Sequence, residues 1–299
     1  MKDYYIYYDK NFVKQSNATL PVLSASTQFG LNVFEGIRVY KEDLFYVFRL
    51  DDHLKRLNNS LIKIGFDIEV ISKKEFLNIL KELIKLNNIK TDFSIRFTYL
   101  VNEMDSWSSK KRPVFFIAPL IKDRNSPEVY RTMVLTNTRR ISSFAMDPKV
   151  KCGANYINGR YALLEAKSKG ADLPLLKNKD GYISESSGSC VFLIKNEVVI
   201  TPSLDCDILE SITRDTVIKI LLENDFKVEE RLILEEELVE SDEIFLCGSA
   251  AEITPIKLIE QIDFKIGDMT KYIFHEYQLA ITAQSYQNYS WTTKLKTKD

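Results

Sequence analysis

A lysine followed by small residues is the first candidate for chemistry in this chain. Lys151 begins the run Lys151-Cys152-Gly153-Ala154-Asn155-Tyr156, and a helical pattern then continues as far as Gly170. A lysine amine in a desolvated site loses its proton more easily and can condense with a carbonyl group. A lone lysine, however, is more often a solvated surface group. Lys151 by itself therefore leaves both interpretations open.

Three further segments favour the chemical interpretation. Glu185 is the only charged residue in the polar stretch 181–189, Thr213 lies near the start of an amphipathic helix, and the small-residue turn 248–251 follows an apolar strand. An amine, an isolated carboxylate and a helix N-terminus together suit a ligand that has an aldehyde, a basic ring nitrogen and a phosphate. Pyridoxal 5'-phosphate is such a ligand.

These segments give the chain a resemblance to a known family. It resembles the fold-type-IV pyridoxal-phosphate enzymes, and among them the branched-chain amino acid aminotransferases, over nearly its whole length. The motifs that carry the resemblance stand in the family's order: Phe34-Glu35-Gly36-Ile37-Arg38, Gly181-Tyr182-Ile183-Ser184-Glu185, Ile212-Thr213-Arg214-Asp215 and Gly248-Ser249-Ala250-Ala251-Glu252-Ile253-Thr254-Pro255. The resemblance implies a two-domain α/β (α+β) fold. It also implies transfer of an amino group from an apolar or branched-chain L-amino acid to 2-oxoglutarate by a ping-pong mechanism.

The resemblance further implies which residues hold the cofactor. Lys151 is expected to be the catalytic Schiff-base lysine, Glu185 to face the pyridine nitrogen and keep it protonated, and Arg56 to bind the phosphate. The remaining expected cofactor residues are Tyr156, Ile212, Thr213 and Ser249. From the sequence alone, Ser211 and Thr213 could equally serve only to cap their helix, because capping and anion binding use the same geometry.

The substrate residues are also implied by the resemblance, but here the chain departs from the family. The expected residues are Phe29, Phe34, Gly36, Arg38, Arg96, Ser249 and Ala250. Arg96 is expected to receive the acidic side chain of glutamate and its oxo acid, although a solvent-facing strand arginine is an equally open interpretation. The family has tyrosine at positions 29 and 94, threonine at 249, asparagine at 190 and glycine at 211, where this chain has Phe29, Ser94, Ser249, Cys190 and Ser211.

The departures lie mainly on the substrate side, so several alternatives stay open. The chain could transaminate a D- or specialised amino acid, could be a lyase of the aminodeoxychorismate type, or could be a non-catalytic partner subunit. The resemblance implies a homodimer or larger homo-oligomer, in which a loop around Asn102 to Arg112 reaches the neighbour's site. Trp107 in that loop fits an interface contact.

Composition excludes several other classes of protein. The 299 residues include 41 Lys and Arg against 42 Asp and Glu, which gives a net charge of -1 and no basic footprint for nucleic acid. No apolar run approaches the roughly 20 residues of a membrane helix, and the N-terminus lacks a signal-peptide core. The expected location is the cytoplasm. The cysteines are not spaced as zinc or redox pairs, so they are expected to be reduced thiols and no metal is expected.

The length suits two domains, each with its own core. The expected division is a small N-terminal α/β domain at 1–120, a linker at 121–130, and a larger C-terminal domain at 131–299 that carries Lys151. Apolar spacing predicts helices at 50–64, from Ser72 onward, and at 155–169, 213–224, 234–239 and 269–282. The end of the chain after Trp291 is expected to fray.

Overall fold

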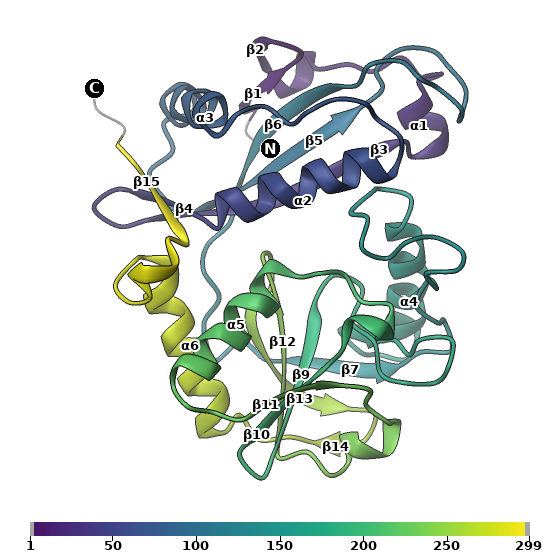
Figure 1. The fold of residues 1–299 in the computed structure, drawn as a ribbon, viewed down its shortest axis with the longest axis vertical. Coiled ribbons are helices and arrows are strands. Elements are labelled where there is room, and N and C mark those ends of the chain that lie inside the picture. The colour runs from purple at the N-terminus through teal and green to yellow at the C-terminus, as the bar shows by residue number, and fades with distance from the viewer. Residues whose placement is uncertain (1–2, 297–299) are drawn as a thin grey trace. The chain divides into compact units, whose positions relative to one another are not determined.

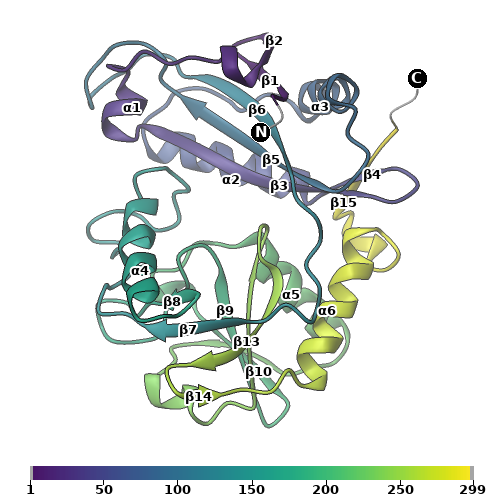
Figure 2. The same cartoon turned by 180° about the vertical axis from the view of Figure 1, so that it is seen from behind.

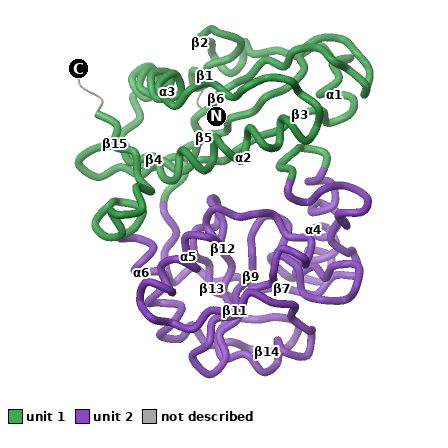
Figure 3. The backbone as a smooth tube through the Cα atoms, viewed as in Figure 1, with its two compact units in different colours: residues 1–123, 150–154, 280–299 green, residues 124–149, 155–279 purple. Residues whose placement is uncertain are grey.

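A computed structural model describes residues 3–296 and divides the chain into two compact units (Figure 3). Unit 1 contains Met1–Asp123, Val150–Ala154 and Ala280–Asp299, and unit 2 contains Arg124–Lys149 and Asn155–Leu279. Each unit is built on its own β-sheet with helices, so the predicted mixed α/β class is confirmed. None of the helices within residues 3–296 is long and apolar enough to cross a membrane.

The units differ from the expected domains in two places. The chain passes from unit 1 to unit 2 after Asp123, inside the expected linker, but residues 150–154 and 280–299 return to unit 1. Backbone pairing explains both returns. Phe34 N–H donates to the Lys151 carbonyl at 3.0 Å, and the strand Thr292–Leu295 pairs with Phe45–Phe48. The expectation of a frayed end is therefore wrong for 292–295, while residues 297–299 lie outside the described part of the chain.

Unit 1 is a seven-stranded sheet with helices packed on it. Its strands are β1 (Tyr5–Tyr8), β2 (Asn11–Lys14), β3 (Asn32–Lys41), β4 (Phe45–Phe48), β5 (Phe93–Leu100), β6 (Val114–Ile121) and β15 (Thr292–Leu295). They lie in the order β15-β4-β3-β5-β6-β1-β2, with antiparallel pairing throughout. The helices are α1 (Ala25–Phe29), α2 (Leu50–Lys63) and α3 (Lys73–Asn87), with single 3₁₀ turns η1 (Gln15–Asn17) and η4 (Gln287–Tyr289).

Helix α2 forms where the leucine spacing predicts it and buries that stripe. Leu50, Leu57 and Leu61 are fully buried in one core with residues of β3 and β5. The helix runs along β3 in both views (Figure 1, Figure 2). Helix α3 begins as its capping motif predicts, because the Ser72 hydroxyl accepts a hydrogen bond from the Glu75 N–H at 3.2 Å. Packing of the apolar face of α2 thus fixes which of its polar residues lie next to β3.

Unit 2 is an eight-stranded sheet. Its strands are β7 (Arg131–Leu135), β8 (Leu173–Leu175), β9 (Cys190–Lys195), β10 (Val198–Pro202), β11 (Val228–Arg231), β12 (Glu243–Gly248), β13 (Glu252–Ile259) and β14 (Ile262–Asp263). Their order is β11-β10-β9-β12-β13-β7-β8, with β14 beside β13. Helix α4 (Tyr156–Ser168) packs on β7 and β8, and α5 (Ile212–Glu223) packs on β11 and β12. Unit 2 also contains a 3₁₀ turn, η2 (Leu204–Cys206), and most of the last helix, α6 (Asp268–Ile281).

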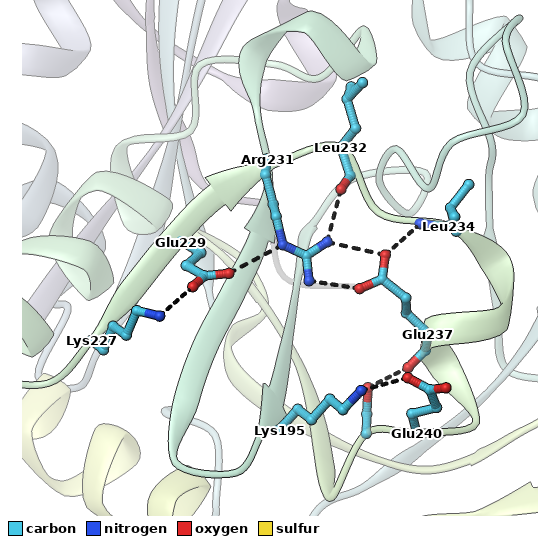
Figure 4. Close-up of polar contacts among 9 residues, drawn as sticks. Lys195, Lys227, Glu229, Arg231, Leu232, Leu234, Glu237 and Glu240 are labelled. Atoms are coloured by element: carbon cyan, nitrogen blue, oxygen red, sulfur yellow. Dashed lines mark hydrogen bonds and ion pairs between the residues drawn. The ribbon is translucent and has the colours of Figure 1, made fainter.

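The predicted helix at 234–239 is only a short 3₁₀ turn, η3 (Glu235–Leu238). Charged contacts hold it against the end of β11 (Figure 4). Arg231 donates through two nitrogens to the Glu237 carboxylate, at 3.0 and 2.6 Å, and Glu229 lies on the Nε side of the same guanidinium. These side chains are partly exposed, so the contacts are worth little individually. They position a turn rather than build a functional site.

Candidate active site

The Lys151 segment is held on unit 1 by β3 and α2. Lys151 N–H donates to the Ser60 hydroxyl of α2 at 3.2 Å, and its carbonyl accepts from Phe34 N–H of β3. Gly153 makes the close approach possible, since a Cβ there would lie 2.8 Å from the Asn32 side chain. The small residues after Lys151 therefore serve to seat the lysine against the strand.

Two cationic side chains meet the ring of Phe34. Lys151 Nζ lies 5.1 Å from the ring centroid, and the Arg96 guanidinium lies 4.4 Å from it. Gly36 pairs with Arg96 across β3 and β5, and a Cβ added at Gly36 would meet no atom within 4 Å. The strand backbone at Gly36 thus borders open space on the side where a side chain would project. Unit 1 brings together Lys151, Phe34, Gly36 and Arg96, all of them expected site residues.

Arg56 lies on the same helix as Ser60 and is bound by a buried carboxylate. Its Nε donates to Glu35 Oε1 at 2.6 Å and its Nη2 donates to Glu35 Oε2 at 2.7 Å. Burial alone would raise the pKa of Glu35, but Arg56 and His53 outweigh it and hold that pKa well below its usual range. Burial lowers the pKa of His53, and the charges of Arg56 and Lys151 lower it further. Glu35 raises this pKa but does not outweigh them. Sequence reasoning assigned no role to Glu35 or His53.

Glu185 of unit 2 is likewise a buried carboxylate beside an arginine. Its Oε1 lies 2.9 Å from Arg140 Nε, and its Oε2 accepts from the Leu209 N–H at 3.4 Å and from the Cys190 thiol at 3.9 Å. A guanidinium beside a buried carboxylate compensates its negative charge. Sequence reasoning missed Arg140, although the pair Arg139-Arg140 a few residues after β7 was visible in the sequence.

The N-terminus of α5 has the form expected of an anion site and is also capped. The Ser211 hydroxyl accepts from the Arg214 N–H at 3.2 Å, so Ser211 is the N-cap of the helix. Ile212 and Thr213, in the first turn, are both buried. Capping by Ser211 uses the third N–H of the helix and does not involve the N–H groups of Ile212 and Thr213.

The turn that contains Ser249 and Ala250 joins β12 to β13 and is held by hydrogen bonds from Asn125. Glu252, which ends the turn, is fully buried with a φ of 48°. Its Oε2 accepts from the Asn125 N–H at 2.8 Å, and the Asn125 amide donates to the Ala251 carbonyl and to Thr254 Oγ1. Asn125 fixes the path of this turn and is another residue that sequence reasoning missed.

The other expected residues lie in more varied places. Phe29 ends α1 and is 44% exposed, and Tyr156 begins α4 at 38% exposed. Arg38 is buried, and its guanidinium donates to the carbonyls of Lys122 and Asp123 at 2.7 and 3.1 Å. Its Nη1 also lies 3.4 Å from the Ser94 hydroxyl, at the position where tyrosine was expected.

The donors and acceptors fit pyridoxal phosphate. The chain offers an amine at Lys151, a guanidinium at Arg56, a helix N-terminus at Thr213 and a buried carboxylate at Glu185. The hydroxyls on either side of Glu185, those of Ser184 and Ser186, are buried and have no hydrogen-bond partner within residues 3–296. Such hydroxyls are costly to leave unpaired and suit a polar ligand.

Known proteins are similar to this chain over nearly its whole length. The model of the family amino-transferase class IV matches residues 32–259. A putative branched-chain-amino-acid aminotransferase of Methanocaldococcus jannaschii is 33% identical over 273 residues, covering 89% of this chain and 92% of that protein. The crystal structure of the branched-chain aminotransferase from Thermoproteus uzoniensis with norvaline has a TM-score of 0.92 at 31% identity, covering 99% of this chain and 100% of that chain.

A holo structure gives the same result. The branched-chain amino acid aminotransferase from Thermobaculum terrenum, in its pyridoxal-phosphate form, has a TM-score of 0.88 at 30% identity and covers 98% of this chain and 99% of that one. The predicted resemblance and the predicted cofactor are thereby confirmed. Since the family model spans most of the chain, this protein belongs to the class IV aminotransferases, enzymes that depend on pyridoxal phosphate.

Proposed function

We propose that this aminotransferase moves the amino group of an apolar or branched-chain L-amino acid to 2-oxoglutarate, with Lys151 as the catalytic residue. The names of its relatives support the donor class, since the Escherichia coli protein is called a branched-chain-amino-acid aminotransferase and the Methanocaldococcus jannaschii protein a putative one. The reaction is ping-pong, so the oxo acid made from the donor leaves before 2-oxoglutarate binds.

The observation that carries the proposal is the shared contact of Lys151 and Arg96 with the ring of Phe34. The two cationic groups lie 5.1 and 4.4 Å from the ring centroid. An amine that handles the amino group and a guanidinium that can receive a second carboxylate thus lie on one aromatic side chain. This pairing supports an acceptor with two carboxylates, such as 2-oxoglutarate.

When bound, the cofactor would supply an aldehyde for the amino group and a ring that can accept electrons from the donor Cα. Lys151 would hold the cofactor covalently and, once the donor amine has displaced it, its freed amine would move the proton at the donor Cα. Glu185 keeps the ring nitrogen protonated through its negative charge. Arg56 and the first turn of α5, with Ile212 and Thr213, bind the phosphate. Tyr156 donates to the ring oxygen, and Ser249 adds a hydroxyl.

The substrate residues follow from the same assignment. Phe29, Phe34 and Gly36 line the space for the donor side chain, and the turn with Ser249 and Ala250 binds the substrate carboxylate through hydroxyl and N–H groups. Arg38 supports this region by holding the backbone at Lys122 and Asp123. Ser94 replaces a tyrosine and contributes a shorter hydroxyl beside Arg38.

Purified protein with pyridoxal phosphate tests the proposal. L-leucine plus 2-oxoglutarate should yield glutamate, and D-alanine plus 2-oxoglutarate should yield much less. Glutamate formed only from D-alanine would instead indicate a D-amino acid aminotransferase. Pyruvate released from aminodeoxychorismate without any acceptor would indicate a lyase, and no product from any of these mixtures would favour a non-catalytic subunit.

We also propose that the protein is a homodimer, with the loop 102–112 at the interface. Large apolar side chains are exposed in this part of unit 1, including Met104 at 65% and Trp107 at 74%. Val22, at 78%, precedes Leu23, whose carbonyl accepts from Asp105 N–H at 3.4 Å. Exposed apolar groups of this size are typical of association surfaces. Light scattering after gel filtration should give at least twice the monomer mass, and Trp107→Glu should lower it.

A further inference from the structure

A buried carboxylate on β3 binds the arginine to which we assign the binding of the cofactor phosphate. Glu35 is fully buried, and both of its oxygens accept from Arg56, at 2.6 and 2.7 Å. This two-point contact fixes the guanidinium plane, which a single hydrogen bond would leave free to turn. Arg56 has five N–H groups in a rigid fork, so a partner on one edge determines where the other edge points.

His53 completes the arrangement from the same helix. Its Nδ1 lies 2.7 Å from Glu35 Oε2, and the ring is almost fully buried. An ionised carboxylate can only accept, so His53 Nδ1 carries the hydrogen and donates it. His53, Arg56 and Ser60 follow one another at helical spacing along α2, and Ser60 accepts from the Lys151 N–H. One polar stripe of α2 therefore holds both Arg56 and the backbone of Lys151.

We propose that Glu35 is a positioning residue that orients Arg56 toward the cofactor phosphate, with His53 holding the Glu35 carboxylate in place. The inference rests on the proposed role of Arg56 in phosphate binding. Glu35 does not bind the phosphate itself, because two anions would repel one another. It acts only through the guanidinium.

Electrostatics alone makes the opposite prediction, and this makes the inference testable. If Glu35 did no more than neutralise Arg56, its removal would leave a stronger positive charge and tighten phosphate binding. If Glu35 positions Arg56, its removal frees the guanidinium and weakens phosphate binding. The sign of the change distinguishes the two.

The experiment compares pyridoxal phosphate with pyridoxal, which lacks the phosphate. The dissociation constant of each is measured by absorbance titration and dialysis for the wild-type protein, Glu35→Gln, Arg56→Ala and the double variant. The dissociation constant for pyridoxal divided by that for pyridoxal phosphate measures the preference for phosphate. Glu35→Gln should reduce this ratio by about tenfold or more, the size expected for one charged hydrogen bond. The double variant should be no worse than Arg56→Ala, because Glu35 acts through Arg56.

Two controls separate positioning from general damage. Glu35→Asp keeps the charge but shortens the side chain, so it should also reduce the ratio and serves if Glu35→Gln does not fold. Glu243→Gln removes another buried carboxylate, one that caps α6 in unit 2, and should leave the ratio unchanged. Titrations are run well below the melting temperature of each variant.

The outcomes also distinguish this inference from the proposed function. A wild-type protein that prefers the phosphate, with Glu35 variants that keep or increase that preference, would overturn the role of Glu35 alone. The role of Glu35 would also be overturned if the losses of phosphate preference in Glu35→Gln and Arg56→Ala simply added in the double variant. A wild-type protein without any preference for the phosphate would overturn both this inference and the assignment of Arg56.

Discussion

Arg140 Nε lies 2.9 Å from Glu185 Oε1, and the two side chains are only 11% and 7% exposed. A buried carboxylate that loses its cationic partner is left uncompensated, and its ionised form becomes costly. The Glu185 charge is the one that we assign to the cofactor ring nitrogen. We therefore expect Arg140 to position Glu185, although it lies in a different segment of unit 2.

Replacing Arg140 with glutamine should lower kcat more than it changes KM. Without its partner the Glu185 carboxylate is no longer held in place, so it should stabilise a protonated ring less well, which matters for the chemical step rather than for binding. A kcat loss of about tenfold to a hundredfold is expected, consistent with a contribution of about 1.4 to 3 kcal/mol. Arg139→Gln, at an exposed neighbouring position, is the matched control. A variant at Arg140 with unchanged kcat would contradict the assigned role.

The buried His53 should make stability depend on pH. Its pKa is lowered in the folded protein, first by burial. The unfolded chain therefore binds the proton more readily than the folded one below the unfolded pKa of about 6.5. The contribution of His53 to the stability of the fold is fully present above that pH and is lost as the pH falls toward the folded pKa. The slope from this group is at most about 1.4 kcal/mol per pH unit.

Urea unfolding between pH 8 and pH 5 checks this prediction. His53→Gln should flatten the dependence, although it should also lower stability at every pH because it disturbs the contact with Glu35. The chain has only 2 histidines, and the exposed one gives the control, since His275→Gln should leave the slope as it is in the wild-type protein. A slope that survives in His53→Gln would assign the dependence to other groups.

Gly267 should tolerate no side chain. A Cβ at this position would lie 2.0 Å from Glu243 Oε1, and the same carboxylate accepts from Met269 N–H at 3.3 Å and Thr270 N–H at 2.9 Å. Gly267→Ala must displace the carboxylate that caps α6, at an expected cost of about 1–3 kcal/mol. Gly188→Ala is the control, because a Cβ there meets no atom within 4 Å. Equal melting temperatures for the two variants would contradict the cap.

Local sequence signals predicted most of the helices. The leucine spacing of 50–64 became α2 (Leu50–Lys63), and the motif at Ser72 became the start of α3. Both signals act within a few residues, where propensity, spacing and capping suffice. The segment 234–239 lacked such support, and its acidic run forms only a 3₁₀ turn held by Arg231.

Contacts between distant segments could not be predicted in this way. The strand β15 exists because it pairs with β4, and the Lys151 segment joins unit 1 because Phe34 binds its carbonyl. The roles expected of Lys151, Arg56 and Glu185 came from the family resemblance together with their residue types. Their partners Glu35, His53 and Arg140 were missed, since a buried ion pair is defined by where two segments meet and a sequence pattern gives only one side of it.

Reductive trapping tests directly whether Lys151 carries the cofactor. The purified protein is saturated with pyridoxal phosphate, reduced with borohydride, digested, and mapped by mass spectrometry. We expect one major adduct, on the peptide that contains Lys151, and its disappearance when L-leucine is added in excess before reduction. An adduct on a different lysine, or an adduct that L-leucine leaves unchanged, would contradict it.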